Sequence, residues 1–245
     1  MTAGAVPPLP VERLILWRHG RTEWNAEGRF QGQLDPPLDD TGRRQAAAAA
    51  PYVAAGLRPE DTVVVSSDLD RAADTARALG RLIGVEVRLD ERLREHGMGS
   101  WEGLTRAEVA DRFPHQFADW MAGRPVLGRG GEEPAAVGKR AVAALADLPR
   151  AAVAVVVTHG GTAGRLIERL LDLADDHRRV FGPLANCAWS ELGVQGGRWR
   201  LLRHNLAVQP QLGGRLEGVG PVPAADAGAT PDGGAAAPPG DADAV

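Results

Sequence analysis

Three apolar segments of the sequence end in basic or hydroxyl side chains that share one kind of chemistry. They are Arg18 and His19 after residues 14–17, Ser66, Ser67 and Arg71 after residues 63–65, and His159 after residues 155–158. In open α/β sheets, ligands bind beyond the carboxyl ends of the strands, where the N-termini of helices also point. If the three segments are neighbouring strands, two imidazoles and two guanidinium groups converge at one edge of a sheet.

A phosphoryl group is the ligand that such a cluster suits. A planar guanidinium matches phosphate oxygens with paired hydrogen bonds. Arg71 falls in the first turn of an expected helix, where a cation costs about 0.3–1 kcal/mol and an anion bound beside it would reverse that sign. Phosphoryl transfer also needs an in-line nucleophile, for which the imidazole of His19 is the candidate. A poor leaving group needs a proton donor on the opposite side as well.

The candidate proton donor is a carboxylic acid in the stretch RLREHGMGSWEGL, residues 92–104. This stretch offers Glu95 within a glycine-punctuated loop and Glu102 a short distance behind it, and the position in the loop favours Glu95. A protonated imidazole on the adjacent His96 would lower the pKa of Glu95 and oppose its action as an acid. The pH optimum is therefore left open.

Two other kinds of site could be formed by these segments. Asp68 and Asp70 could belong to a magnesium-dependent aspartyl phosphatase, but the sequence places no further acidic ligands at plausible strand ends. The segment THGGTAG, residues 158–164, follows a strand and opens a helix, yet it has neither the dinucleotide-binding nor the P-loop spacing. We therefore expect a phosphoryl-transfer site that uses no metal and no cofactor.

The elements that must position these side chains alternate between apolar runs and helical patterns. Strands are predicted at 13–17, 61–67, 85–90 and 151–161, followed by two strands within 186–204 that join at Gly196 and Gly197. Helices are predicted at 41–56, 68–84, 134–148 and 162–173. A further helix begins at the capping box Thr105–Glu108, breaks near Pro114 and resumes through Trp120. This alternation is typical of an α/β fold with a mostly parallel sheet.

Composition and charge indicate one domain followed by a tail. The chain has 245 residues, of which 44% are hydrophobic and 24% charged, enough for one sizeable core. Residues 213–245 are mainly Gly, Ala, Pro and Asp, so ordering them could not offset their conformational entropy. We expect a domain over residues 1–212 and a disordered tail over 213–245. The tail holds one arginine against five carboxylates, which accounts for the formal net charge of −4.

The sequence also argues against several kinds of partner. Near-neutral charge outside the tail argues against a nucleic-acid binder that relies on a broad basic surface. No run approaches the ~18 apolar residues of a membrane span, and no signal peptide is evident. Cys187 is the only cysteine, which rules out an intrachain disulfide and fits a reducing compartment. We expect a cytoplasmic protein that binds no nucleic acid and no membrane; a homodimer is compatible with the sequence.

Four separated motifs, RHGRTEWN, SSDLDRAADTA, LREHGMGSWEG and VVVTHGG, occur here in the order found in the histidine phosphatase superfamily. The chain resembles that family from about residue 13 to residue 204. The resemblance implies a phosphoglycerate-mutase-like fold, a three-layer α/β sandwich. It also implies that His19 forms a phosphohistidine and that Glu95 protonates the leaving group and then activates water. The phosphoryl oxygens would be bound by Arg18, Arg71 and His159.

The same family has further polar side chains near the phosphate or the substrate, and here these are Thr22, Asn25 and Gln31. Arg21 stands where the family more often has glutamate or glutamine. We expect this extra cation to bind a second anionic group on the substrate.

Two features point towards hydrolysis. The short segment between Glu95 and His159 lacks the insertion of the family's glycolytic mutases, which favours a phosphatase. The stretches RFQGQLD, NCAWSEL and RWRLLRHN resemble those of actinobacterial glucosyl-3-phosphoglycerate phosphatases. The expected substrate is a small phosphorylated metabolite: glucosyl-3-phosphoglycerate, a related phosphoglycerate or a sugar phosphate. A phosphoglycerate-type mutase and a catalytically silent phosphate-binding protein remain as alternatives.

Overall fold

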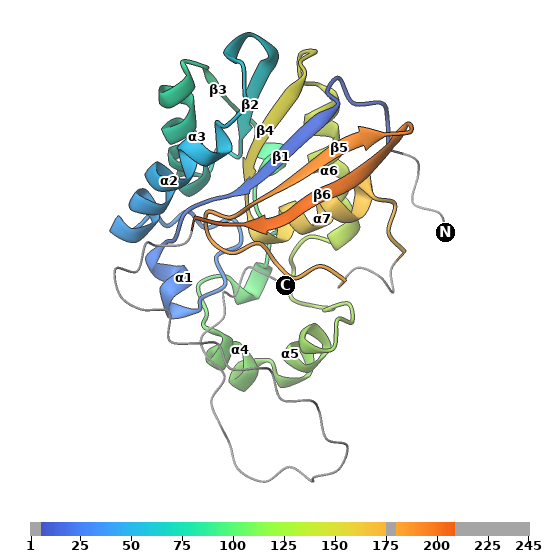
Figure 1. Ribbon diagram of the computed structural model, residues 1–245. Coiled ribbons are helices and arrows are strands. Elements are labelled where there is room, and N and C mark those ends of the chain that lie inside the picture. The colour runs from blue at the N-terminus through green and yellow to red at the C-terminus, as the bar shows by residue number, and fades with distance from the viewer. Residues whose placement is uncertain (1–5, 175–179, 209–245) are drawn as a thin grey trace, which may run out of the picture.

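A six-stranded sheet forms the centre of the molecule. The structure is a computed structural model that describes residues 6–174 and 180–208. The strands are β1 (Arg13–Arg18), β2 (Thr62–Ser66), β3 (Val87–Leu89), β4 (Val153–Thr158), β5 (Trp189–Gln195) and β6 (Arg198–Leu206). They lie in the order β3-β2-β4-β1-β5-β6 (Figure 1). The first four are parallel, whereas β5 is antiparallel to β1 and β6 to β5, so the predicted mostly parallel sheet is confirmed.

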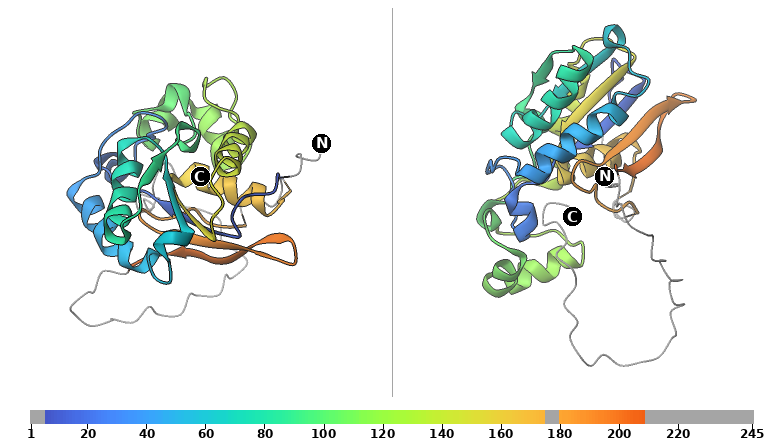
Figure 2. Two further views of the ribbon diagram at one scale, coloured as in Figure 1. Left: turned by 90° about the horizontal axis from the view of Figure 1, so that it is seen from above. Right: turned by 60° about the vertical axis from the view of Figure 1, so that its left-hand side comes forward.

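Helices cover both faces of this sheet. They are α1 (Glu23–Glu27), α2 (Asp40–Val53), α3 (Asp70–Ile83), α4 (Arg106–Arg112), α5 (Pro114–Met121), α6 (Pro134–Ala146) and α7 (Gly160–Leu170). Short 3₁₀ helices occur at Pro59–Asp61, Glu91–Leu93 and Gly99–Trp101. α2 and α3 pack on one face and α6 and α7 on the other (Figures 1 and 2). The expected three-layer sandwich is therefore confirmed.

Burial on both faces explains why the central strands are continuous apolar runs. In β1, Leu14 and Leu16 belong to the core beneath α6 and α7, while Ile15 and Trp17 belong to the core beneath α2 and α3. Side chains alternate along a strand, so a strand covered on both faces needs apolar residues at every position. The apolar run ends at Arg18, the last residue of β1, at the carboxyl edge of the sheet.

Two short helices lie beyond the carboxyl edge of the sheet, below it in Figure 1. α4 begins at the predicted capping box, in which Thr105 accepts from the Glu108 N–H group, and Pro114 opens α5 as a separate helix. These helices pack through an aromatic cluster that includes Phe30, Trp101 and Trp120. The cluster fixes the loop after α1 and the loop after β3 against one another.

One helix was not expected from the sequence. α1 has five residues, too few for a periodic pattern, and is marked by the capping box between Thr22 and Asn25. The other predicted helices and strands are all present, with ends that differ by a few residues.

Two glycines allow α2 to approach the loop that follows β1. A Cβ atom at Gly20 would lie 2.5 Å from the carbonyl oxygen of Gly42, and a Cβ atom at Gly42 would collide with the carbonyl oxygen of Arg21. Only glycine therefore permits this contact, which supports the loop immediately after Arg18.

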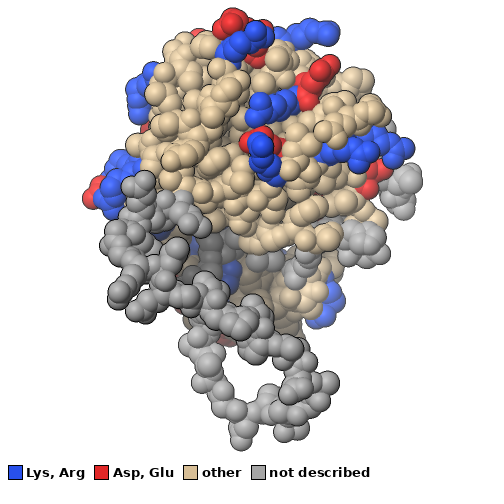
Figure 3. Space-filling view, viewed as in Figure 1, with Lys and Arg blue, Asp and Glu red and all other residues tan. Residues whose placement is uncertain are grey.

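Basic and acidic side chains are interspersed on the face seen in Figure 3, where no continuous basic stripe is visible. In the described ranges 6–174 and 180–208, no helix is both long and apolar enough to cross a membrane. The tail predicted over 213–245 lies outside the described residues, and the domain boundary at residue 212 stays a prediction.

Candidate active site

The sheet order brings three of the predicted polar strand ends together. β2 and β1 flank β4, and Arg18 pairs in register with Thr158, the last residue of β4. The residues that follow β1 and β4 are therefore neighbours, and the ring centroids of His19 and His159 lie 5.1 Å apart. Five of the predicted residues are fully buried in this region, namely Arg18, His19, Arg71, Glu95 and His159.

His19 is held in one tautomer by its own neighbour. Its Nδ1 atom lies 2.7 Å from the carbonyl oxygen of Gly20. A carbonyl only accepts, so Nδ1 carries the proton and Nε2 keeps its lone pair. Nε2 has no hydrogen-bond partner among the described residues. Burial, with the charges of Arg71 and Arg18, lowers the pKa of His19 well below 6.5, so the ring is neutral and Nε2 is available as a nucleophile.

Main-chain carbonyl groups hold the two buried guanidinium groups. Arg18 donates from Nη1 to the carbonyl oxygen of Leu184, at 2.8 Å. Arg71 donates to the carbonyl oxygens of Leu34 and Gly32, at 2.7 and 2.8 Å. The loop before α2 thus wraps the Arg71 side chain and fixes where its charge lies.

His159 is the residue at the N-cap position of α7, and its side chain contacts Ser67. Its Nε2 atom lies 2.9 Å from Ser67 Oγ, while its Nδ1 atom has no hydrogen-bond partner within the described part of the chain. Burial first, and then the charge of Arg71, lowers the pKa of His159 well below 6.5. This imidazole is therefore also neutral near pH 7.

Glu95 lies at the start of the same helix. Its carboxylate accepts from the N–H groups of Gly161, at 3.0 Å, and Thr162, at 2.9 Å, and from its neighbour His96 at 2.7 Å. A Cβ atom at Gly161 would lie 2.8 Å from Glu95 Oε1, so glycine is needed for this approach. The structure therefore brings Glu95 beside the helix that begins immediately after His159.

The other carboxylate of that loop has a different environment. Glu102 accepts from the main-chain N–H groups of Gln33 and Met98, at 3.2 and 2.9 Å. It joins the loop after α1 to the loop after β3, and these contacts indicate a role in holding the two loops.

His96 does not supply the positive charge that its position in the sequence suggested. Its ring Nε2 atom lies 2.7 Å from the carbonyl oxygen of Glu132. Burial, the largest cause, lowers the pKa of His96 below 6.5, so the ring is neutral near pH 7. The anticipated electrostatic conflict with Glu95 is therefore absent at neutral pH.

Thr22, Asn25 and Gln31 form one hydrogen-bonded group. The Asn25 carboxamide oxygen accepts from the Thr22 N–H group and from Asn186 Nδ2, both at 3.1 Å. The Gln31 carboxamide oxygen lies 3.0 Å from the Thr22 hydroxyl. Because both oxygens are engaged by Thr22, the amino group of each carboxamide is turned away from it.

Arg21 is engaged elsewhere. Its Nε atom donates to Asp39 at 2.7 Å and Nη2 donates to Thr41 at 3.1 Å, at the start of α2. The side chain remains 40% exposed, so the ion pair is partly screened by solvent. The prediction that Arg21 contacts the substrate stays a prediction.

Several residues at the site were not identified from the sequence. Ser67 contacts His159, Asn186 contacts both Asn25 and the His19 carbonyl group, and Arg140 of α6 donates to the carbonyl group of Glu95. Each contact joins residues far apart in the chain. The sequence provides a weak indication for Ser67, which follows an apolar strand together with other polar residues. It provides no indication for Asn186 or Arg140.

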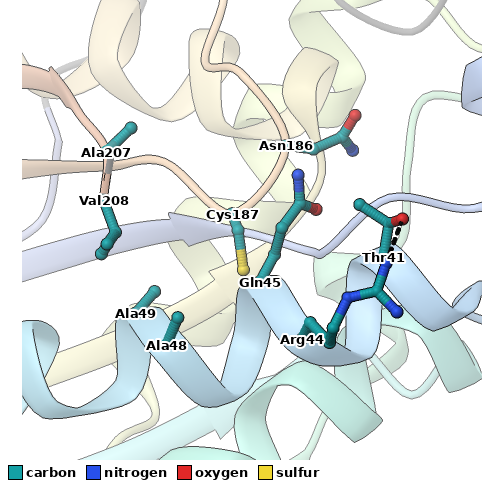
Figure 4. A pocket seen from close by; sticks show the side chains of 9 residues that line it. All are labelled: Thr41, Arg44, Gln45, Ala48, Ala49, Asn186, Cys187, Ala207 and Val208. Carbon is teal, nitrogen blue, oxygen red and sulfur yellow. Dashed lines mark hydrogen bonds between the residues drawn. The ribbon is translucent and has the colours of Figure 1, made fainter. Parts of the chain in front are cut away.

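A pocket of about 340 Å³ lies between α2, the residues that precede β5 and those that follow β6 (Figure 4). It is lined by Thr41, Arg44, Gln45, Ala48, Ala49, Asn186, Cys187, Ala207 and Val208. Gln45 accepts from the Arg21 N–H group at 2.9 Å, so one wall supports the loop after His19. Burial raises the pKa of Cys187 to about 12, which keeps its thiol protonated.

One of the two aspartates considered for a magnesium site is engaged by an arginine. Arg94 donates to both carboxylate oxygens of Asp68, at 2.8 and 2.5 Å. Among residues 6–174 and 180–208, no group of three or more His, Cys, Asp or Glu side chains is placed to hold a metal ion. The expectation that the protein uses no metal or cofactor stays a prediction.

The three-layer fold with its mostly parallel sheet, and the paired imidazoles at the carboxyl edge of that sheet, define a protein of the phosphoglycerate-mutase-like class. The chain belongs to the histidine phosphatase superfamily (branch 1), which it matches over residues 14–207. This membership confirms the resemblance inferred from the four motifs and excludes the aspartyl phosphatase interpretation.

Named relatives include both a phosphatase and a mutase. The chain is 38% identical to a glucosyl-3-phosphoglycerate phosphatase from Mycolicibacterium vanbaalenii, over 81% of this chain and 96% of the relative. A mycobacterial glucosyl-3-phosphoglycerate phosphatase, solved in complex with VO3, is 38% identical with a TM-score of 0.71, over 80% of this chain and all of that one. A probable phosphoglycerate mutase, GpmB, from Cronobacter sakazakii is 36% identical over 76% of this chain and 87% of the relative.

Proposed function

We propose that this histidine phosphatase hydrolyses a small phosphorylated metabolite through a phosphohistidine formed at His19. One observation carries the proposal above the others. The hydrogen bond from His19 Nδ1 to the Gly20 carbonyl group leaves Nε2 unprotonated in a site that also contains Arg18 and Arg71. A neutral imidazole with a free lone pair is the form that attacks phosphorus.

In the first step, the lone pair of His19 Nε2 forms a bond to phosphorus while the bond from phosphorus to the ester oxygen breaks. Glu95, in its protonated form, gives its proton to that oxygen, so the alcohol leaves neutral. Charge on the phosphoryl oxygens is stabilised by Arg18, Arg71 and His159. Asn25 and Gln31 add amide donors, and Thr22 orients them.

In the second step, water attacks the phosphohistidine. Glu95, now ionised, accepts a proton from the water, the N–P bond breaks, and inorganic phosphate leaves with His19 neutral again. The hydrogen bonds from Gly161 and Thr162 to Glu95 suit this ionised form. They stabilise the base that the second step needs.

The substrate is proposed to be glucosyl-3-phosphoglycerate or a related phosphoglycerate or sugar phosphate. The name of the 38% identical relatives supports this class. A mutase is the second candidate, since a relative with 36% identity is named a probable phosphoglycerate mutase. A mutase would return the phosphoryl group from His19 to a second hydroxyl group instead of to water.

Product analysis separates these two candidates. The full chain is incubated with glucosyl-3-phosphoglycerate, 3-phosphoglycerate and a panel of sugar phosphates, and free phosphate and isomerised products are quantified. Hydrolysis predicts one equivalent of phosphate for each substrate consumed. Isomerised product with little free phosphate would instead support the mutase, and binding without any turnover would support a silent phosphate-binding protein.

The remaining parts of the proposal concern the conditions of the reaction. We propose that it takes place in the cytoplasm and needs no metal or cofactor. Turnover should then be unchanged after dialysis against a chelator, and loss of activity that Mg²⁺ restores would contradict this. A homodimer is tested by light scattering on the full chain.

A further inference from the structure

The two buried imidazoles differ in what fixes their protons. His19 Nδ1 faces a carbonyl group, which only accepts a hydrogen bond. His159 Nε2 faces the hydroxyl group of Ser67 at 2.9 Å, and a hydroxyl group can donate or accept. The tautomer of His159 therefore depends on where the Ser67 proton goes.

A second contact of Ser67 decides this. The N–H group of Leu69 points at Ser67 Oγ at 3.3 Å, so this oxygen already accepts one hydrogen bond. Among the described residues, the only acceptor paired with the Ser67 hydroxyl proton is His159 Nε2. If His159 Nε2 carried a hydrogen instead, the hydroxyl proton of a fully buried serine would have no acceptor, which costs about 1–3 kcal/mol.

The ring of His159 holds one proton near pH 7, because burial and Arg71 lower its pKa well below 6.5. If Nε2 accepts from Ser67, that single proton lies on Nδ1. Nδ1 is buried and has no hydrogen-bond partner within the described ranges, and the His159 ring lies beside that of His19.

We propose that Ser67 is a positioning residue that holds His159 in the Nδ1–H tautomer, so that His159 presents a hydrogen-bond donor to the phosphoryl oxygens. The donor role rests on the proposed phosphatase function; the tautomer does not. The two histidines of the site thus differ in the ring atom that remains for a ligand. The hydrogen bond to the Gly20 carbonyl group leaves an unprotonated nitrogen on His19, whereas the hydrogen bond from the Ser67 hydroxyl group leaves an N–H group on His159.

The first test is made on the unaltered full chain. Protein labelled with ¹⁵N-histidine is studied by nitrogen–proton correlation spectroscopy, which shows which ring nitrogen carries hydrogen. The His159 signals are assigned by their loss in His159→Asn. We expect hydrogen on Nδ1 of His159 and on Nδ1 of His19. Hydrogen on Nε2 of His159 would overturn the proposal, whether or not the protein turns over any substrate.

The second test compares two neighbouring serines. Ser67→Ala removes the hydroxyl that contacts His159, whereas Ser66→Ala removes an equally buried hydroxyl that donates to the Ser67 carbonyl group. With Ser67→Ala we expect hydrogen to appear on Nε2 of His159 and inorganic phosphate to bind about tenfold more weakly. We also expect kcat to fall about 100- to 1,000-fold, as for the loss of one donor to a transition state. Ser66→Ala should stay within about twofold of the unaltered protein.

These outcomes distinguish the inference from the proposed function. A folded Ser67→Ala protein with unchanged tautomer and unchanged phosphate affinity would overturn the role of Ser67 while leaving hydrolysis through His19 intact. Absence of turnover in the unaltered protein would instead remove the phosphatase proposal, and the tautomer would still be read from the spectra. If Ser67→Ala does not fold, the spectrum of the unaltered protein decides.

Discussion

His19 and Glu95 show how neighbours, more than residue type, set chemical roles. A single hydrogen bond to Gly20 turns His19 into a lone-pair donor, and the start of α7 holds Glu95 as an acceptor of main-chain N–H groups. The sequence motifs were sufficient to identify both residues as candidates for the site. The partners that set their protonation, such as Ser67, depend on contacts across the fold and could not be inferred from spacing.

Replacing Glu95 with glutamine removes proton transfer while keeping size. With an alkyl phosphate, whose leaving oxygen needs a proton, we expect turnover to fall by about 10²–10⁴-fold. Nitrophenyl phosphate needs no proton for its leaving group, so its first turnover should be affected far less. Rapid-mixing measurements should show a burst of about one nitrophenol per protein followed by slow release of phosphate.

The nitrophenyl ester serves as the control for the alkyl phosphate, because both substrates are measured with the same Glu95→Gln protein. An equal loss in the first turnover of both substrates would show that Glu95 is not the acid.

Arg140 shows how a helix holds the loop that contains Glu95. From α6 it donates to the carbonyl groups of Arg92, Arg94 and Glu95, at 2.7–2.9 Å, and its Nε and Nη2 atoms contact Glu132. Glu132 in turn accepts from the Gly97 N–H group at 2.8 Å. The sequence predicted α6 from its apolar pattern, but a polar residue on a helix gives no signal of which distant backbone it contacts.

Replacing Arg140 with methionine removes these contacts while keeping the apolar stem. We expect the free energy of unfolding to fall by about 1–3 kcal/mol. Turnover of an alkyl phosphate should fall by up to about 100-fold, because Glu95 loses its fixed position. Urea unfolding and steady-state kinetics measure the two effects.

Lys139→Met is the matched control, since Lys139 is an exposed residue of the same helix. It should change neither quantity appreciably. If Arg140→Met lost stability but kept its kcat, the contacts with the Glu95 loop would be structural only.

At the scale of the whole molecule, the fold buries two neutral histidines beside two arginines. The three central strands were predicted because their apolar runs are long, and their adjacency was inferred from how α/β sheets are built. Neither α1 nor the ion pair between Arg21 and Asp39 could be predicted from the sequence. A five-residue helix is too short to show helical periodicity, and an ion pair across a loop leaves no pattern in the sequence.

Burial of His19 and His159 predicts how stability depends on pH. Both pKa values lie well below 6.5 in the folded protein and near 6.5 in the unfolded chain. Between these pKa values the unfolded state binds more protons, so the free energy of unfolding is fully retained above pH 6.5 and falls as the pH decreases. The slope should reach about 1.4 kcal/mol per pH unit for each histidine.

Urea unfolding between pH 8 and pH 5 measures this slope. His96 contributes in the same direction, since its pKa is also lowered. The double variant His19→Asn with His159→Asn should therefore reduce the slope without abolishing it. A stability that is unchanged from pH 8 to pH 5 in the unaltered protein would contradict neutral burial of these rings.

Trapping the covalent intermediate is the most direct measurement. The protein is mixed with substrate and quenched within one turnover in cold denaturant near neutral pH, because phosphohistidine is lost in acid and phosphoaspartate in alkali. Peptide mass spectrometry is then used to locate the phosphate. We predict one phosphate on His19 and none in the His19→Asn variant; phosphate on an aspartate such as Asp68, or steady turnover with no phosphoprotein, would contradict the mechanism.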